Sequence, residues 1–262
     1  MYWDVGNNNH VKLSLAKADF PRNASTFLAK NLPEDSAMAK TLLTFLIEYY
    51  STVYEDLVQQ LGSATALDHL SKSLFAVVIG SNDILGYFKS GSDLPKKITQ
   101  QQYVDLMVRA SPTVFVVAGI GAVGCCPSQR NQNKTSEECN EEANYWSVKY
   151  NEGLKSMLQG LKSELNDMDY SFVDTYTIFS SFVQSPSTYG FTEVKSACCG
   201  LGNLRAQVPC VPVAKYCSNR SDPVFWDLYH PTEAAAHLFV NAVFDGSQQF
   251  AMPMNVNQLI AA

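Results

Sequence analysis

Hydrophobic residues follow two different patterns along this chain, and the two patterns predict two kinds of element. Six segments have a helical pattern, in which apolar residues return every three or four positions and form one buried face. The longest of them ends at Leu165 and would turn Trp146, Tyr150, Leu154, Met157, Leu161 and Leu165 inward. The predicted helices cover residues 37–62, 64–71, 98–109, 137–165, 175–183 and 232–244.

Three shorter segments predict strands, and the first of them is a continuous apolar run rich in Val and Ile, as strands buried on both faces are. They are Leu74–Ile79, Val114–Ala118 and Tyr170–Val173. Strands that alternate with helices predict βαβ units and a mostly parallel sheet with helices on both sides, an α/β fold in three αβα layers. No shift in composition marks a linker, so we expect a single domain over residues 1–262.

The charge balance excludes some functions. The formal net charge is -6 and no basic cluster interrupts it, which argues against a nucleic-acid partner. No apolar run reaches the roughly 18 residues of a membrane-spanning helix. The sequence does not indicate an oligomeric state.

Seven cysteines are many for a cytosolic protein. Cys198, Cys199, Cys210 and Cys217 share one loop-rich stretch, and their spacing does not match a zinc site. A loop closed by disulfides is favoured over free thiols, with the pairing open and at least one thiol left over. Three glycosylation sequons begin at Asn23, Asn133 and Asn219 and also point to a secretory ancestry.

Two groups of polar residues could carry chemistry. Asp227 stands three residues before His230, and a carboxylate beside an imidazole can fix its tautomer for proton transfer. Asn82 follows the first strand and could donate a hydrogen bond to an oxyanion. There is also a simpler interpretation of each. Asp227 and His230 could be near each other by coincidence on the surface, and Asn82 could be a helix cap. Gly119 and Gly121 after the second strand fit a ligand approach and a tight turn equally well.

Longer motifs argue against the surface coincidence and the helix cap. The chain resembles the plant GDSL esterase/lipases of the SGNH hydrolase superfamily over nearly its whole length from Asp4 onward. The motifs that carry the resemblance are Asp4–Asn9, Leu15–Pro21, Val78–Asp83, Gly119–Pro127, Ala197–Gly200 and Phe225–Glu233.

The resemblance implies a flavodoxin-like SGNH hydrolase fold, secretion, and hydrolysis of lipid or other acyl esters through an acyl-enzyme. It implies that His230 is the general base, that Asp227 orients it, and that Asn82 is an oxyanion-hole donor. No metal or organic cofactor is implied, and the partner is a small-molecule ester.

The chain departs from the family pattern at two places. Counting back from Asp4, the nucleophilic Ser falls on Met1, and no other Ser has a nucleophile context. A long stretch with a further strand and an oxyanion glycine is missing between about Leu32 and Leu43. We therefore expect a sheet without its first strands and a domain incomplete at its N-terminus.

Two functional expectations follow from these departures. Residues 1–262 contain no nucleophile, so their hydrolytic activity is expected to be weak or absent, and a non-catalytic protein that binds a lipid, glycan or protein is the alternative. Met1–Gly6 contains no basic or apolar leader, which favours an intracellular form of this chain.

Overall fold

The computed structural model describes residues 54–71, 76–78, 80–88, 116–133, 135–165 and 168–261. The predicted helix 98–109 and most of the predicted helix 37–62 lie outside these residues. Residues 54–61 are helical, and Gly62, with φ of +79°, follows them. The other helices of more than one turn are α3 (Ser63–Ser71), α4 (Ser81–Tyr87), α8 (Glu141–Glu164), α9 (Thr175–Gln184), α10 (Glu233–Phe244) and α11 (Val256–Ala261). Within the described ranges, no helix combines the length and the apolarity needed to cross a bilayer.

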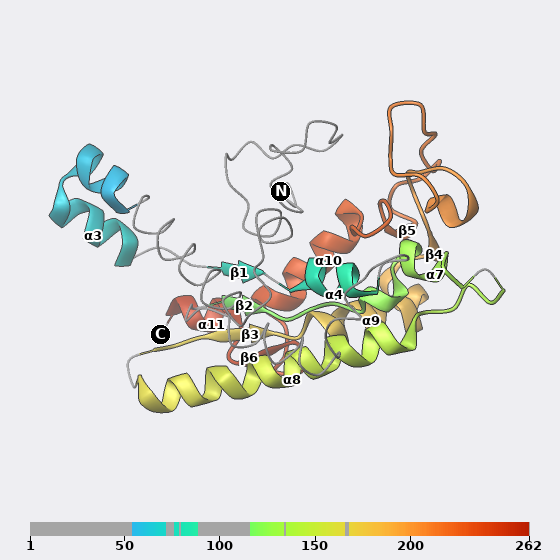
Figure 1. The fold of residues 1–262 in the computed structure, drawn as a ribbon. Coiled ribbons are helices and arrows are strands. Elements are labelled where there is room, and N and C mark those ends of the chain that lie inside the picture. Colours follow the sequence, from blue (N-terminus) through green and yellow to red (C-terminus); the bar gives the residue numbers. More distant parts are fainter. Residues whose placement is uncertain are drawn as a thin grey trace, which may run out of the picture.

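A four-stranded sheet forms the centre of the fold (Figure 1). Its order is β1 (Ala76–Val78), β2 (Val116–Ala118), β3 (Ser171–Val173) and β6 (Ala251–Pro253). The first three strands are parallel, in line with the prediction, and β6 runs antiparallel to β3. The sequence did not predict β6, because its three residues include a proline and show no alternation of apolar and polar residues.

Helices cover both faces of this sheet, so the predicted three-layer αβα arrangement is confirmed. Alternate strand residues point to opposite faces. Val116, Ala118 and Val173 therefore share one core with residues of α9, α10 and α11, including Ile178, Phe182, Ala235, Phe239 and Val256. Val117 and Phe172 face the other way, and Figure 1 shows α8 running across that side. The second core is completed by Ile84 of α4 and by Tyr150, Leu154 and Leu158 of α8.

The predicted inward face of α8 is partly wrong. The helix begins at Glu141 because Asn140 caps it, accepting a hydrogen bond from Ala143 N. Its buried face combines Tyr150, Leu154 and Leu158 with the polar residues Asn144, Ser147 and Asn151. Leu165, expected inward, lies beyond the helix and is 50% exposed.

A second, smaller sheet carries the functional motifs. It pairs β4 (Glu193–Ala197) with β5 (Pro223–Phe225) in parallel, and neither strand was predicted. The connection between them, residues 198–222, is closed by the disulfides Cys198–Cys217 and Cys199–Cys210, and we call it the disulfide lobe. A third disulfide joins Cys125 to Cys139, and Cys126 is the free thiol. The predicted stapled loop is thus confirmed, with one unpaired cysteine.

The edge strand β1 and the inner strand β3 of the described sheet differ in burial, and this difference gives a test. Val78 and Val173 point to the same sheet face, but Val78 is 58% exposed and Val173 only 1%. Val173→Ala should lower the free energy of unfolding by about 2 kcal/mol because it leaves a cavity. Val78→Ala should cost less than about 0.5 kcal/mol. Urea denaturation of both variants makes the comparison, and equal losses would show that Val78 is buried in solution.

Candidate functional site

Asp227 and His230 lie in a tight turn that follows β5. We call Trp226–Pro231 the dyad turn. Trp226 N donates to His230 O at 2.7 Å, and Phe225 forms an antiparallel bridge with Pro231, so the chain returns beside its own strand. Thr232 then caps α10: its buried Oγ1 donates to Pro223 O at 2.8 Å and accepts from Ala235 N. The turn is therefore held at both ends by secondary structure.

The two side chains meet inside this turn. Both Oδ atoms of Asp227 lie 2.7 Å from His230 Nδ1. Asp227 Oδ1 also accepts the backbone N–H groups of Tyr229 and His230 at 2.9 Å each. A carboxylate at Nδ1 favours the tautomer with its proton there, which leaves Nε2 with a free lone pair. Nε2 is buried and makes no hydrogen bond with the described residues.

The surroundings keep Asp227 ionised. Burial favours the neutral acid, but the hydrogen bond and charge of His230 and the two backbone donors outweigh it. The pKa of Asp227 consequently lies below its ordinary value. An anionic Asp227 can stabilise an imidazolium at His230, which is what acid–base chemistry needs from the pair.

A short helix on the neighbouring segment supports the dyad turn. This helix is α7 (Pro127–Arg130), which follows the 3-10 turn η2 (Val123–Cys125). Ser128 N donates to Leu228 O at 3.1 Å, and Cys126 Sγ donates to Tyr229 O at 3.7 Å. Both acceptors lie between Asp227 and His230, so the position of α7 sets the position of the dyad.

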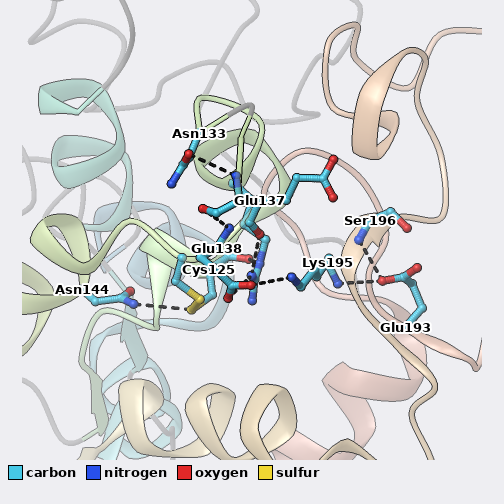
Figure 2. Close-up of polar contacts among 11 residues, drawn as sticks. Cys125, Asn133, Glu137, Glu138, Asn144, Glu193, Lys195 and Ser196 are labelled. Carbon is cyan, nitrogen blue, oxygen red and sulfur yellow. Dashed lines mark hydrogen bonds and ion pairs between the residues drawn. A yellow bond between two sulfur atoms is a disulfide. The ribbon is translucent and has the colours of Figure 1, made fainter.

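Arg130 holds α7 in place from within. Its side chain is 2% exposed, and its guanidinium donates to Cys125 O at 2.9 Å and Glu137 O at 3.0 Å. Burial lowers the pKa of Arg130, and the charge of Glu138, 3.9 Å away, opposes this. Figure 2 shows Lys195 of β4 reaching Glu138, with a separation of 2.7 Å. The segment carrying α7 is thereby tied to the sheet that leads into the dyad turn.

Cys126 does not offer a nucleophile in place of Ser. Burial, together with the nearby charge of Asp227, raises the pKa of its thiol to about 12. A thiol with that pKa stays protonated at neutral pH, and only the thiolate is strongly nucleophilic.

Asn82 lies on a different element from the dyad. It is the second residue of α4, which starts directly after β1 and Gly80, and its side chain is solvent-exposed. The helix-cap reading is therefore wrong, since Gly80 occupies the cap position with φ of 104°. Because α4 packs on η2, the segment that supports the dyad turn also borders the Asn82 helix.

Asp83, next to Asn82, has a perturbed acidity that the sequence did not indicate. Burial raises its pKa to about 6, and a hydrogen bond from its own backbone N–H opposes the rise. A carboxyl group with this pKa beside a strand end is a marker of functional sites in general.

The glycines after β2 have a structural explanation. A Cβ on Gly119 would lie 2.6 Å from Asn151 Oδ1, so Asn151 fills the space that a ligand would need. Gly121 has ordinary van der Waals room, with Thr175 as its nearest neighbour at 3.4 Å. The close approach at Gly119 is therefore to the protein's own Asn151, which neither the ligand interpretation nor the tight-turn interpretation included.

The remaining predicted site elements lie outside the described residues: position 1, the motifs Asp4–Asn9 and Leu15–Pro21, and the stretch around residues 32–43. Conversely, sequence reasoning missed Ser128 and Arg130. The motif Gly119–Pro127 ends immediately before them, and it was the one signal that could have drawn attention to this segment.

Known proteins resemble the chain over most of its length. The model of the GDSL-like lipase/acylhydrolase family matches residues 7–243. GDSL esterase/lipase At5g55050 of Arabidopsis thaliana is 40% identical, covering 98% of this chain and 87% of the relative. At1g71691 and At3g50400, GDSL esterase/lipases of the same plant, are 32% and 33% identical over 81% of this chain.

The relatives are longer than this chain. The chain spans 59% of At1g71691 and 62% of At3g50400, less than two thirds of each. The match to At5g55050 extends over 329 residues, whereas this chain has 262. That relative therefore carries residues within the matched region that have no counterpart here.

The depressed pKa of Asp227 predicts a pH-dependent contribution to stability. A carboxyl whose folded pKa is lowered stabilises the fold above its unfolded value near 3.9, and this contribution is lost as the pH falls through the folded pKa. Asp227→Asn should therefore cost about 2 kcal/mol at pH 7 and progressively less toward pH 3. Asp169→Asn, in an exposed ion pair with Lys162, is the control and should change little. A cost of Asp227→Asn that does not vary with pH would contradict the assignment.

The buried guanidinium of Arg130 gives a second test. Arg130→Met leaves the carbonyls of Cys125 and Glu137 without their donor and should cost about 3 kcal/mol. Lys149→Met, which removes an exposed cation paired with Glu152, should cost less than about 0.5 kcal/mol. Urea denaturation measures both, and the Nδ1 proton of His230 in an NMR spectrum should broaden or shift only in Arg130→Met. Similar losses of stability in the two variants would refute the bracing role of Arg130.

Proposed function

Because the chain belongs to the GDSL-like lipase/acylhydrolase family, we propose that its site serves the hydrolysis of carboxylic esters of lipids or other acyl groups. The observation that carries the proposal is the geometry at His230. Its Nδ1 lies 2.7 Å from both oxygens of an ionised Asp227, while Nε2 has no hydrogen-bond partner among the described residues. An imidazole held in this way is prepared to accept a proton at Nε2.

The proposed reaction has two halves. In the first, His230 Nε2 removes the hydroxyl proton of a Ser as its oxygen attacks the ester carbonyl, and the same proton passes to the departing alcohol. In the second, water attacks the acyl-enzyme while His230 takes a proton from it and returns that proton to the Ser. Asp227 keeps the ring oriented and stabilises the imidazolium in both halves.

Asn82 is the proposed oxyanion donor. Its position in the first turn of α4, at the carboxyl end of β1, supports this role because ligands of α/β sheets gather at such ends. Asn82 is solvent-exposed, as a residue that contacts a substrate must be. Loss of one such donor in a Ser hydrolase costs about 100- to 1000-fold in turnover.

The identity of the nucleophile separates two candidate functions. Within residues 1–262 the family's Ser position coincides with Met1. The raised pKa of the Cys126 thiol argues against Cys126 as a replacement nucleophile. A non-catalytic protein that binds a lipid, glycan or protein at the retained site is the second candidate, and Met1 is the observation that favours it.

The disulfides favour folding in an oxidising compartment. Three disulfides close the loops around the site, and such bonds persist in secreted proteins. Asn133 and Asn219 are exposed, as glycan attachment requires. We therefore include passage through the secretory pathway in the proposal, in place of the intracellular form that the first residues favour.

Restoring the nucleophile tests the function directly. The restored chain carries Gly-Asp before position 1 together with Met1→Ser and Tyr2→Leu, so that it reads Gly-Asp-Ser-Leu. It should hydrolyse a nitrophenyl ester at least about 100-fold faster than the same chain with His230→Ala. Residues 1–262 without these changes should show no difference between His230 and His230→Ala.

A fluorophosphonate probe and circular dichroism complete the design. The restored chain should be labelled by the probe, and residues 1–262 should not. A folded, unlabelled restored chain that still binds an ester would favour the non-catalytic candidate. Turnover by residues 1–262 that falls in His230→Ala would reveal another nucleophile and contradict the assignment of position 1.

A further inference from the structure

The disulfide lobe exposes several large apolar side chains to solvent. Val213 is 79% exposed and Tyr216 is 50% exposed, and Leu201 and Val208 are also exposed. Leu201 and Val208 face each other across an antiparallel bridge, so their side chains lie on the same side of the lobe. Gathered apolar residues at a surface mark a site of interaction with a protein or a membrane.

The lobe holds these residues rigidly outward. Two disulfides cross it, and Cys199 pairs with Tyr216 in a second bridge. Its tip is a turn closed by a 2.8 Å hydrogen bond from Ala214 N to Val211 O, which places Pro212 and Val213 at the apex. Figure 1 shows the segment between β4 and β5 projecting from the body of the protein. The apolar tip is therefore already ordered before a partner arrives.

The charge of the lobe is opposite to that of the whole protein. The lobe contains Arg205, Lys215 and Arg220 and a single acid, Asp222, whereas the chain as a whole carries -6. Arg205 is engaged with Cys198 O, and Asp222 accepts from Asn219. Lys215 and Arg220 are exposed on the lobe, and the Arg220 guanidinium lies 5.1 Å from the Tyr216 ring. Cations beside exposed apolar groups are the pattern of surfaces that enter anionic lipid headgroups.

The lobe is joined directly to the dyad turn. Cys199 N donates to Trp226 O at 2.7 Å, and the ring of Tyr216 stacks on that of Trp226 with centroids 5.5 Å apart. Trp226 precedes Asp227 in the chain. The base of the lobe is consequently adjacent to the dyad turn, and both belong to the same part of the protein.

We propose that the disulfide lobe docks onto an anionic lipid surface, with Val213 inserted at the boundary and Lys215 and Arg220 on the headgroups. The docking does not depend on turnover; that the surface also supplies the ester rests on the proposed function. A second copy of the chain is a poorer occupant, because a twofold contact through the lobe would place Lys215 and Arg220 against their own copies. An anionic bilayer satisfies the apolar and the cationic groups together.

Co-sedimentation with vesicles tests the proposal on the full 262-residue chain. Binding should be seen with vesicles of phosphatidylcholine and phosphatidylglycerol and be much weaker with phosphatidylcholine alone. Val213→Ser should weaken binding about tenfold through lost apolar burial. Lys215→Glu should weaken it at least about fivefold through lost headgroup attraction.

Matched variants on other elements are the controls. Ile260→Ser removes an apolar side chain that is 62% exposed on α11, and Lys149→Glu reverses a charge on α8. Both should bind within about twofold of the unchanged chain. No binding, or equal losses in test and control variants, would overturn the proposal. So would a dimer, detected by sedimentation, that Val213→Ser dissociates. Because co-sedimentation measures binding and not turnover, its failure would leave the proposed hydrolysis, which the nitrophenyl-ester assay measures, untouched.

Discussion

The buried loop that leaves β2 must have its backbone polar groups satisfied, and the rest of the site depends on how this is done. Asn151 of α8 accepts from Ile120 N at 2.7 Å and donates to Ile120 O at 2.8 Å. Two turns earlier on the same helix face, Asn144 accepts from Gly124 N at 2.9 Å. An unpaired buried group costs about 1–3 kcal/mol, so apolar residues at either position would make this path of the chain unfavourable. Two polar side chains inside a core thus fix the course of the loop.

The position of this loop determines a series of contacts that ends at Asp227 and His230. It runs through η2 into α7, where Arg130 satisfies the carbonyls of Cys125 and Glu137. From α7, the contacts of Ser128 and Cys126 reach the backbone between Asp227 and His230. Residues more than a hundred positions apart in sequence therefore share one rigid unit, and the ion pair of Glu138 with Lys195 contributes little beside the buried groups.

The sequence predicted what depends on local pattern and missed what depends on tertiary contact. Val116–Ala118 and Ser171–Val173 are apolar throughout or nearly so, and their alternation with helices indicated the parallel sheet. The buried face of α8 includes the polar residues Asn144 and Asn151, which apolar periodicity does not predict. The same periodicity wrongly predicted that Leu165 is buried. Asp227 and His230 were found because their spacing is local. The role of Arg130 was not found, since a buried guanidinium looks like any surface arginine until its carbonyl partners are known.

The dyad turn is stable for reasons that do not involve a nucleophile. Asp227 is satisfied by two backbone N–H groups and the ring of His230, all within the turn itself. Such a unit would survive the loss of catalysis, so the pairing of Asp227 with His230 also serves the stability of the turn. The informative atom is His230 Nε2, a buried acceptor with no partner in the described part of the chain. Proteins seldom leave such a group unpaired, and where they do, a reacting group commonly completes it. The orientation of this nitrogen, rather than the pairing of Asp227 with His230, marks where a hydroxyl would act.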